Sequence, residues 1–166
     1  MFSITREIGI DAGHRIPLHA SKCRSVHGHR YTIQATCEGR LAEAGAGTDM
    51  VMDFSFLKDV MLNHIDAPCD HGLILASEDP LIDVILTPAQ RDEMHRALDA
   101  VGYSQHVHVA PFGKLYILPN APTAEILAAH WYTRMSSDIL QITRNRVTLE
   151  KVRVWETPNC FADFPA

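Results

Sequence analysis

The segment KCRSVHGHRYTI, residues 22–33, places one thiol and two imidazoles within a few positions of each other. His27 and His29 are two residues apart, so on a β-strand both side chains point to the same side, about 6.5 to 7 Å apart at the backbone. Two imidazoles at that spacing can share one metal ion. A zinc site that keeps its fourth position open for substrate requires a third protein ligand.

Two predicted strands bring a third imidazole to this pair. Residues 2–14 and 27–37 each alternate between apolar and polar positions, and the histidines continue the apolar faces. Antiparallel pairing across the loop 15–26 places His14 beside the other two. A single histidine on an apolar face is usually a hydrogen-bonded core residue, but burying three without a shared ligand would cost about 1 to 3 kcal/mol each. We therefore predict a zinc site formed by His14, His27 and His29.

Cys23, in the loop before the second strand, has two possible roles. As a fourth zinc ligand it would close the site and make it structural. Beside a metal-bound substrate it could instead act as a base or nucleophile. The dipeptide Asp70-His71 offers it a partner, because a carboxylate that orients a histidine raises its basicity, although such a dipeptide is more often a turn. Glu156, near the end of a strand, could accept two parallel N–H bonds from a heterocycle or be a solvated strand end.

The remaining pattern predicts two main helices and a closing hairpin. Asp53 is the predicted N-cap of a helix that ends before Pro68. Pro122 and Thr123 begin a second helix. The segments LEKVRVWET and CFADF, separated by a turn at residues 158–159, predict an antiparallel hairpin.

The stretch 76–118 does not belong to this ββααββ plan. Within it, Thr87 as N-cap, Gln90 as its capping-box partner and Gly102 as a stop predict an extra helix. Residues 106–118 then predict a small hairpin. The stretch could line a pocket or be a peripheral decoration.

The other histidines and cysteines have no predicted role in the site. His106 and His108 form a second HxH pair, but no third ligand accompanies it. Cys37, Cys69 and Cys160 are interpreted as packing residues. The lack of CxxC spacing and of an export signal favours reduced thiols.

Composition limits the class of protein. A length of 166 residues fits one domain, 1–166. The 15 Lys and Arg residues against 20 Asp and Glu give a formal charge of -5 with no basic block, which argues against a nucleic-acid partner. No leader of basic and then apolar residues begins the chain, and no long apolar run follows, so we expect a cytoplasmic protein with no membrane partner.

Six motifs together resemble the 6-pyruvoyltetrahydropterin synthase superfamily, over nearly the whole chain apart from about 76–118. They are AGH at 12–14, CRSVHGH at 23–29, MVMDF at 50–54, DHG at 70–72, PTAE at 122–125 and VWET at 154–157. The spacing of the thiol from HGH is similar to that of the 6-carboxy-5,6,7,8-tetrahydropterin synthase branch, of the queuosine pathway. The animal pyruvoyl enzymes space the thiol further away.

The resemblance implies an α+β architecture called the tunnelling fold. In that fold an antiparallel four-stranded sheet carries two helices on one face, three subunits close their sheets into a barrel, and two trimers stack as a homohexamer. The active sites then lie between subunits.

The resemblance also implies a role for each site residue. Cys23 would be the general base, Asp70 and His71 its relay partners from a neighbouring subunit, and Glu156 the anchor of the pterin ring, with Thr123 as a further contact. One Zn²⁺ per subunit would be held by His14, His27 and His29. Three imidazoles would also hold iron or nickel.

The implied reaction converts 7,8-dihydroneopterin triphosphate to 6-carboxy-5,6,7,8-tetrahydropterin, with release of acetaldehyde and triphosphate. Three alternatives stay open: a pyruvoyl product, an aldolase reaction on dihydroneopterin, and a pterin-binding or structural zinc protein without activity. The triphosphate contacts are unassigned, because the candidate cations Lys22, Arg24 and Arg30 cannot be ranked from the sequence.

Overall fold

The computed structural model describes residues 1–166 and is built on two long paired strands. β1 (Phe2–His14) and β2 (His27–Gly39) pair antiparallel along their whole length, with His14 opposite His27. Ile10 on β1 and Tyr31 on β2 are fully buried, while Asp11 and Arg30 on the other face are exposed. The predicted strands and their alternation are therefore confirmed.

The sheet has seven strands, in the order β4-β5-β3-β1-β2-β6-β7, instead of the predicted four. The four expected strands, β1, β2, β6 (Val147–Thr157) and β7 (Cys160–Phe164), are antiparallel neighbours. Beyond β1 the sheet continues with β3 (Gly72–Ala76), β5 (Gly113–Leu118) and β4 (Ser104–Val109). The pairings of β3 with β1 and with β5 are parallel.

β3 was missed because its sequence, GLILA, does not alternate. Its last four residues are all buried. A continuous apolar run is typical of a parallel strand that is covered on both faces, and it cannot be told from a short helix by periodicity. Within the stretch 76–118, β4 and β5 form the predicted hairpin and extend the sheet at its edge.

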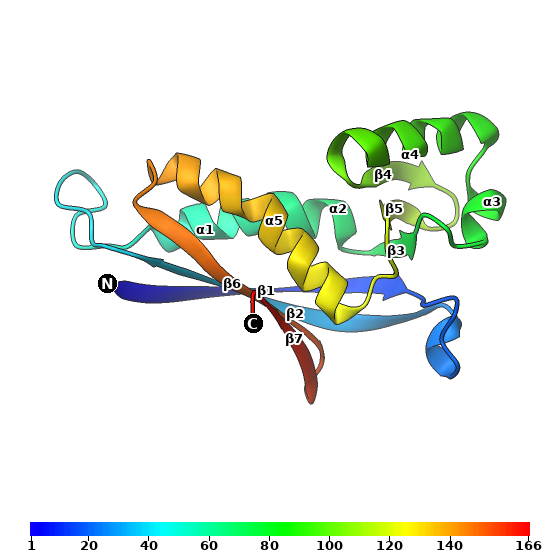
Figure 1. Cartoon of the computed structure of the whole chain (residues 1–166), viewed down its shortest axis with the longest axis horizontal. Helices are drawn as coiled ribbons and strands as arrows, with labels where there is room; N and C mark the ends of the chain where they lie inside the picture. The colour runs from blue at the N-terminus through cyan, green and yellow to red at the C-terminus, as the bar shows by residue number, and fades with distance from the viewer.

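Two helical segments cover one face of the long strands (Figure 1). One consists of α1 (Phe54–Met61), the widened turn η2 (Leu62–Asp66) and α2 (Ala67–Cys69). The other is α5 (Ala124–Ile142), with Thr123 as N-cap. Between these helices and the sheet lies a core of 25 buried residues that includes Leu57, Trp131 and Val154.

The prediction that the first helix ends before Pro68 was wrong. In η2 the N–H of Ala67 donates to the carbonyl of Leu62, five residues back. The wider turn restarts the helix at Ala67, so Pro68 falls in a first turn, where its missing N–H costs little. The helical path therefore continues to Cys69, directly before Asp70.

The remaining helices belong to the added segment. α3 (Leu81–Ile85) is short, and α4 (Pro88–Val101) has the predicted Thr87 and Gln90 capping box and ends at Gly102, whose φ is 79°. α3 and α4 pack on β3, β4 and β5 over a separate cluster of eight buried residues, centred on Leu75 and Leu115. The single-turn helix η1 (Lys22–Arg24) lies in the loop between β1 and β2.

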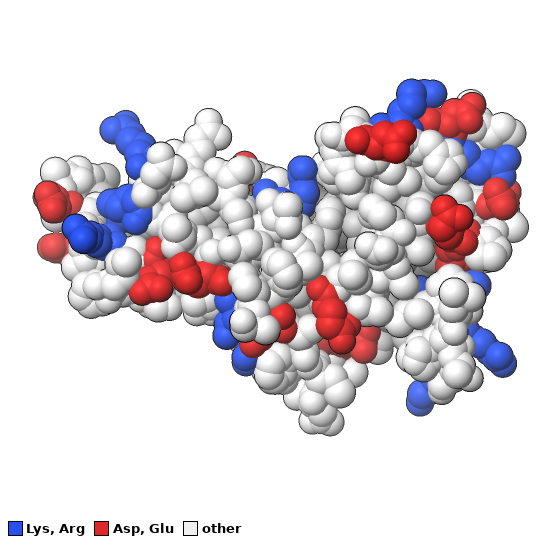
Figure 2. Space-filling model, viewed as in Figure 1, with Lys and Arg blue, Asp and Glu red and all other residues white.

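The four cysteines are free. Cys37 and Cys69 are fully buried, as expected of packing residues, but Cys160 is exposed, so its predicted packing role was wrong. Cys160 begins the terminal strand β7, at the edge of the sheet. No helix is long and apolar enough to cross a membrane. Lys and Arg side chains are interspersed with Asp and Glu over the face shown in Figure 2.

The capping box of α4 predicts a measurable loss of stability on substitution. Thr87→Ala removes the hydroxyl that accepts the N–H of Gln90, so we expect the free energy of unfolding to fall by about 1 kcal/mol in chemical denaturation. Thr133→Ala, an exposed position within α5, is the matched control and should change stability little. Equal effects of both substitutions would contradict the capping role.

Candidate metal centre and active site

The register of β1 and β2 brings three imidazoles together. His14 ends β1, directly opposite His27, and His29 follows on the same face of β2. The Nε2 atoms of His14 and His27 are 3.1 Å apart, and one ring nitrogen from each histidine lies within 4.8 Å of the others. Tetrahedral zinc–imidazole geometry separates two nitrogens by about 3.3 Å. The spacing fits one metal ion.

Backbone carbonyls orient two of the rings. The Nδ1 of His14 lies 2.9 Å from the carbonyl oxygen of Pro122, and the Nδ1 of His27 lies 2.8 Å from that of Ser25. A carbonyl can only accept, so each Nδ1 carries the proton and each Nε2 keeps a free lone pair. The Nε2 of His29 is buried without a hydrogen-bond partner. Nitrogen lone pairs that face one another repel. The three Nε2 atoms therefore suit a shared metal ion better than direct contact with each other.

Burial favours the neutral form of two of the imidazoles. Desolvation lowers the pKa of His14, against the hydrogen bond to Pro122, and it also lowers the pKa of His29. Neutral imidazole is the form that binds a metal. The ring of Tyr31 packs edge-on against both, with centroid distances of 5.8 and 5.5 Å, and burial raises the pKa of its phenol. The floor of the site is thus a neutral aromatic side chain.

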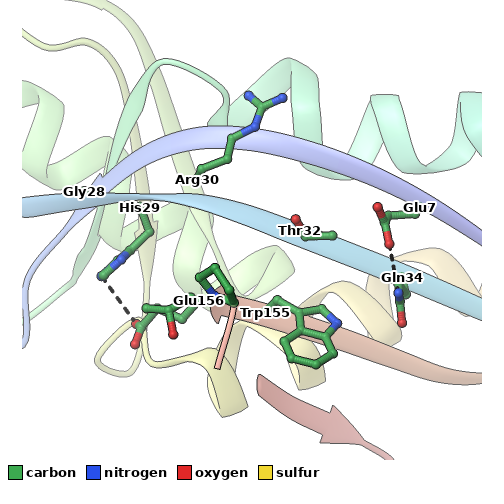
Figure 3. Close-up of a pocket in the computed structure, with 10 residues that line it drawn as sticks. Glu7, Gly28, His29, Arg30, Thr32, Gln34, Trp155 and Glu156 are labelled. Atoms are coloured by element: carbon green, nitrogen blue, oxygen red, sulfur yellow. Dashed lines mark hydrogen bonds and ion pairs between the residues drawn. The ribbon is translucent and has the colours of Figure 1, made fainter. Parts of the chain in front are cut away.

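Glu156 stands at the mouth of the site. Its Oε1 is 3.6 Å from the Nε2 of His14 and 3.9 Å from that of His29. Figure 3 shows the side chains of His29 and Glu156 pointing toward each other from adjacent strands. They border an open cleft of about 600 Å³, which extends onto the outer face of the sheet, where Thr32, Gln34 and Trp155 line it. The volume is that of an ordinary small-molecule site.

Cys23 is not one of the grouped donors. It is half-buried in η1, and its carbonyl accepts a 2.9 Å hydrogen bond from the N–H of Ile16. The group of donor atoms within 4.8 Å contains the three histidines alone. The arrangement favours an open three-ligand centre over one closed by the thiol.

Asp70 and His71 form a connected pair attached to β1. An Oδ of Asp70 lies 2.7 Å from the Nδ1 of His71, and the other accepts the N–H of Asp11 at 2.9 Å. The N–H of His71 donates to the carbonyl of Asp11, which holds His71 at a φ of 55°. Burial opposes ionisation of Asp70, but these hydrogen bonds outweigh it and lower its pKa.

The pair faces a different side of the sheet from the three histidines. His71 is well exposed and borders an open hollow of about 450 Å³, mostly with residues of the outer face such as Asp11, Gly13 and Arg30, although the hollow reaches His29 at its edge. Neither Asp70 nor His71 makes a hydrogen bond to Cys23 or to the three histidines within this chain.

Two of the other predicted positions, Thr123 and Arg30, have structural partners. Thr123 caps α5 by accepting the N–H of Ile126. Arg30 pairs with Asp11 at 2.6 Å and points away from His29 (Figure 3), while Lys22 and Arg24 are exposed.

His106 and His108 are not among the grouped donor atoms. A bulge between Val107 and Val109 breaks the alternation, so His106 is buried beside Ser104 whereas His108 is exposed.

Three contributors to the site were not identified from the sequence. They act through the backbone: the carbonyls of Pro122 and Ser25, and the N–H and carbonyl groups of Asp11. A side-chain pattern carries no signal for such contacts. Tyr31 could have been found, because it continues the His27 and His29 face.

Comparison with known proteins places these features in a family. A family model described as 6-pyruvoyl tetrahydropterin synthase matches residues 3–166. A protein of Rickettsia bellii named 6-carboxy-5,6,7,8-tetrahydropterin synthase is 34% identical over 98% of this chain and 99% of its own. One of the same name from Haemophilus influenzae is 29% identical over 99% of both chains.

Solved structures share the fold at lower identity. An uncharacterised protein from Wolinella succinogenes superposes with a TM-score of 0.72 at 21% identity, covering 98% of this chain and 96% of that one. The 6-pyruvoyl tetrahydropterin synthase of Caenorhabditis elegans gives a TM-score of 0.60 at 19% identity, covering 99% and 95%. The α+β arrangement is therefore that of these proteins.

The lowered pKa of Asp70 predicts how stability depends on pH. A carboxylate with a depressed folded pKa stabilises the protein above its unfolded pKa, about 3.9, and this contribution is lost as the pH falls through the folded value. Asp70→Asn should therefore reduce the free energy of unfolding by about 1 kcal/mol at pH 7, and the difference should shrink below about pH 4. Urea denaturation at several pH values measures it.

The matched control is Asp92→Asn. Asp92 is exposed on α4 and makes no hydrogen bond or ion pair. Its substitution should leave the pH profile of stability unchanged. A pH-independent effect of Asp70→Asn would contradict the charge-based interpretation.

Proposed function

We propose that this chain, which belongs to the 6-pyruvoyl tetrahydropterin synthase family, converts 7,8-dihydroneopterin triphosphate and water to 6-carboxy-5,6,7,8-tetrahydropterin, acetaldehyde and triphosphate. The chain is a lyase with a pterin-synthase function. Relatives that match over nearly their full length carry the carboxy name, which supports this product. The reaction would supply the queuosine pathway.

The observation that carries the proposal is the open three-histidine centre beside the cleft. His14, His27 and His29 would hold Zn²⁺. A bound zinc ion would polarise the side-chain hydroxyls of the substrate and stabilise oxyanion character. The orphaned Nε2 of His29 and the two carbonyl-oriented rings support a resident metal, and three neutral nitrogens suit zinc.

The remaining residues handle protons and orientation. Glu156 accepts two N–H bonds from the edge of the pterin ring, and the cleft next to Trp155 receives the ring. Cys23 removes a proton from the substrate side chain as the general base. His71, oriented by Asp70, shifts the proton toward the ring. Thr123 is a secondary contact at the start of α5.

The position of His71 supports an active site shared between subunits. Because it borders the outer face of the sheet and lacks contact with Cys23 in its own chain, it serves the histidine centre of a neighbouring copy. We propose a single domain, 1–166, assembled as a dimer of trimers with six such sites.

The alternative product is the pyruvoyl compound, which keeps all three side-chain carbons. It is favoured by the family description alone. The two reactions differ in whether the two-carbon fragment leaves, so their products distinguish them.

Product analysis is the direct test of the reaction. Zinc-loaded protein is incubated with 7,8-dihydroneopterin triphosphate, the products are identified by mass spectrometry, and released aldehyde is trapped with a hydrazine. We expect acetaldehyde and 6-carboxytetrahydropterin in equal amounts. A pyruvoyl product without aldehyde would establish the alternative, and no turnover by zinc-loaded protein would refute both.

Substitution of Cys23 separates the two roles of its thiol. As a general base it contributes about a hundredfold or more to the rate, so Cys23→Ala should abolish most turnover and leave the zinc content intact. Cys160→Ala, which removes an exposed thiol, should alter neither. Loss of zinc from Cys23→Ala would show that the thiol is a ligand.

Substitution of a histidine tests the metal centre itself. His29→Ala removes one of three ligands, so bound zinc after dialysis should fall from about one per subunit to near zero. His95→Ala, at an exposed position of α4, controls for the loss of an imidazole. Elemental analysis measures both. Full zinc retention by His29→Ala would place the metal elsewhere.

A further inference from the structure

A buried ion pair joins the added segment to the loop that carries Cys23. Asp79, in the turn between β3 and α3, has a fully buried side chain. Its Oδ2 lies 3.0 Å from the Nε of Arg15, the first residue after β1. Neither atom has a hydrogen-bond partner, so the contact is an attraction between charges and not a hydrogen bond. A buried carboxylate is costly unless it is paired, and this attraction offsets that cost.

Asp79 is itself rigidly fixed. Its other carboxylate oxygen accepts the N–H of Leu81 at 2.9 Å, and its carbonyl accepts the N–H of Ile82 at 2.9 Å. Its own N–H donates to the carbonyl of Ala76 at the end of β3. The carboxylate is therefore anchored to both a strand and a helix before it reaches Arg15.

The other side of the pair leads directly to Cys23. Ile16 follows Arg15, and its N–H donates to the carbonyl of Cys23 at 2.9 Å. That bond closes the base of the loop 15–26, whose remaining residues are mostly exposed. In Figure 1 the loop and α3 lie at the same end of the molecule. The peptide group that holds Cys23 is thus the one that directly follows Arg15 of the ion pair.

The rest of the site is held by other contacts. His14 precedes Arg15, but the carbonyl of Pro122 fixes its ring from α5. His27 is fixed by Ser25 and by its pairing in β2. Loosening the pair formed by Asp79 and Arg15 should therefore move Cys23 before it disturbs the histidines.

We propose that Asp79 and Arg15 are positioning residues that hold the Cys23 loop against the metal centre. The added segment 76–118 then has a function in the site: its first turn places the thiol. This deepens the proposed function, and the expected loss of turnover rests on that function, whereas the chemical reactivity of Cys23 does not.

The test measures alkylation of Cys23 by iodoacetamide in a Cys160→Ser background, because the other two cysteines are fully buried. Asp79→Asn removes the charge and keeps the shape. We expect alkylation about threefold faster or more, because the freed loop exposes its thiol. Zinc content should be unchanged, and kcat should fall about tenfold with a smaller change in KM.

The matched control is Asp83→Asn, which breaks the exposed pair formed with Arg91 in the same segment. It should leave alkylation and kcat unchanged. Arg15→Lys retains the charge and should give a smaller effect in the same direction, which also covers the case in which Asp79→Asn does not fold.

A double-mutant cycle decides between positioning and general stability. If the residues act as a pair, Arg15→Gln combined with Asp79→Asn should alkylate no faster than the faster single variant. Additive effects, or a lower melting temperature with alkylation at the parent rate, would overturn the proposal. If the variants show the expected alkylation pattern but the parent protein makes no pterin product, the proposed function is refuted and the positioning role is not.

Discussion

The antiparallel register of β1 and β2 is the constraint on which the site depends. It sets His14 opposite His27, and the pleat then places His29 on the same face. A shift of one residue would turn two of these rings to the outer face of the sheet. The close approach needs small residues between the ligands: a β-carbon on Gly28 would lie 3.1 Å from the carbonyl oxygen of Ala12. The core on the same face fixes the register through Ile10 and Tyr31.

The sheet also divides the chemistry between its two faces. The three histidines and Glu156 share the face of the core, where burial lowers the pKa of His14 and His29. Asp70 and His71 lie at the outer face, where the backbone of Asp11 holds them by hydrogen bonds. The hollow beside them is open to water and is also lined by Asp11 and Arg30. The proposed metal binding and proton transfer would have different requirements of their surroundings, and one strand, β1, would supply a position for each.

The sequence predicted the elements that carry their own signal, either a repeating apolar pattern or a helix cap. The alternation of residues 2–14 and 27–37 located both strands and their buried faces, and the capping box located α4. It missed β3, whose apolar run has no period, and the passage of a helix through Pro68, which depends on one widened turn. For the site, it predicted that the three histidines lie together, as the structure places them, but not the carbonyls of Pro122 and Ser25, because any residue type provides a carbonyl.

The hydrogen bond from His14 to Pro122 connects the ligand set to the start of α5, the longest helix of the core. A metal ion at this junction would bind only the folded chain, in which strand ends and helix start are together. A free metal concentration a hundredfold above the dissociation constant would then add about 2.7 kcal/mol to the free energy of unfolding. The supply of metal in the cell would thus govern how long the protein survives as well as how fast it works.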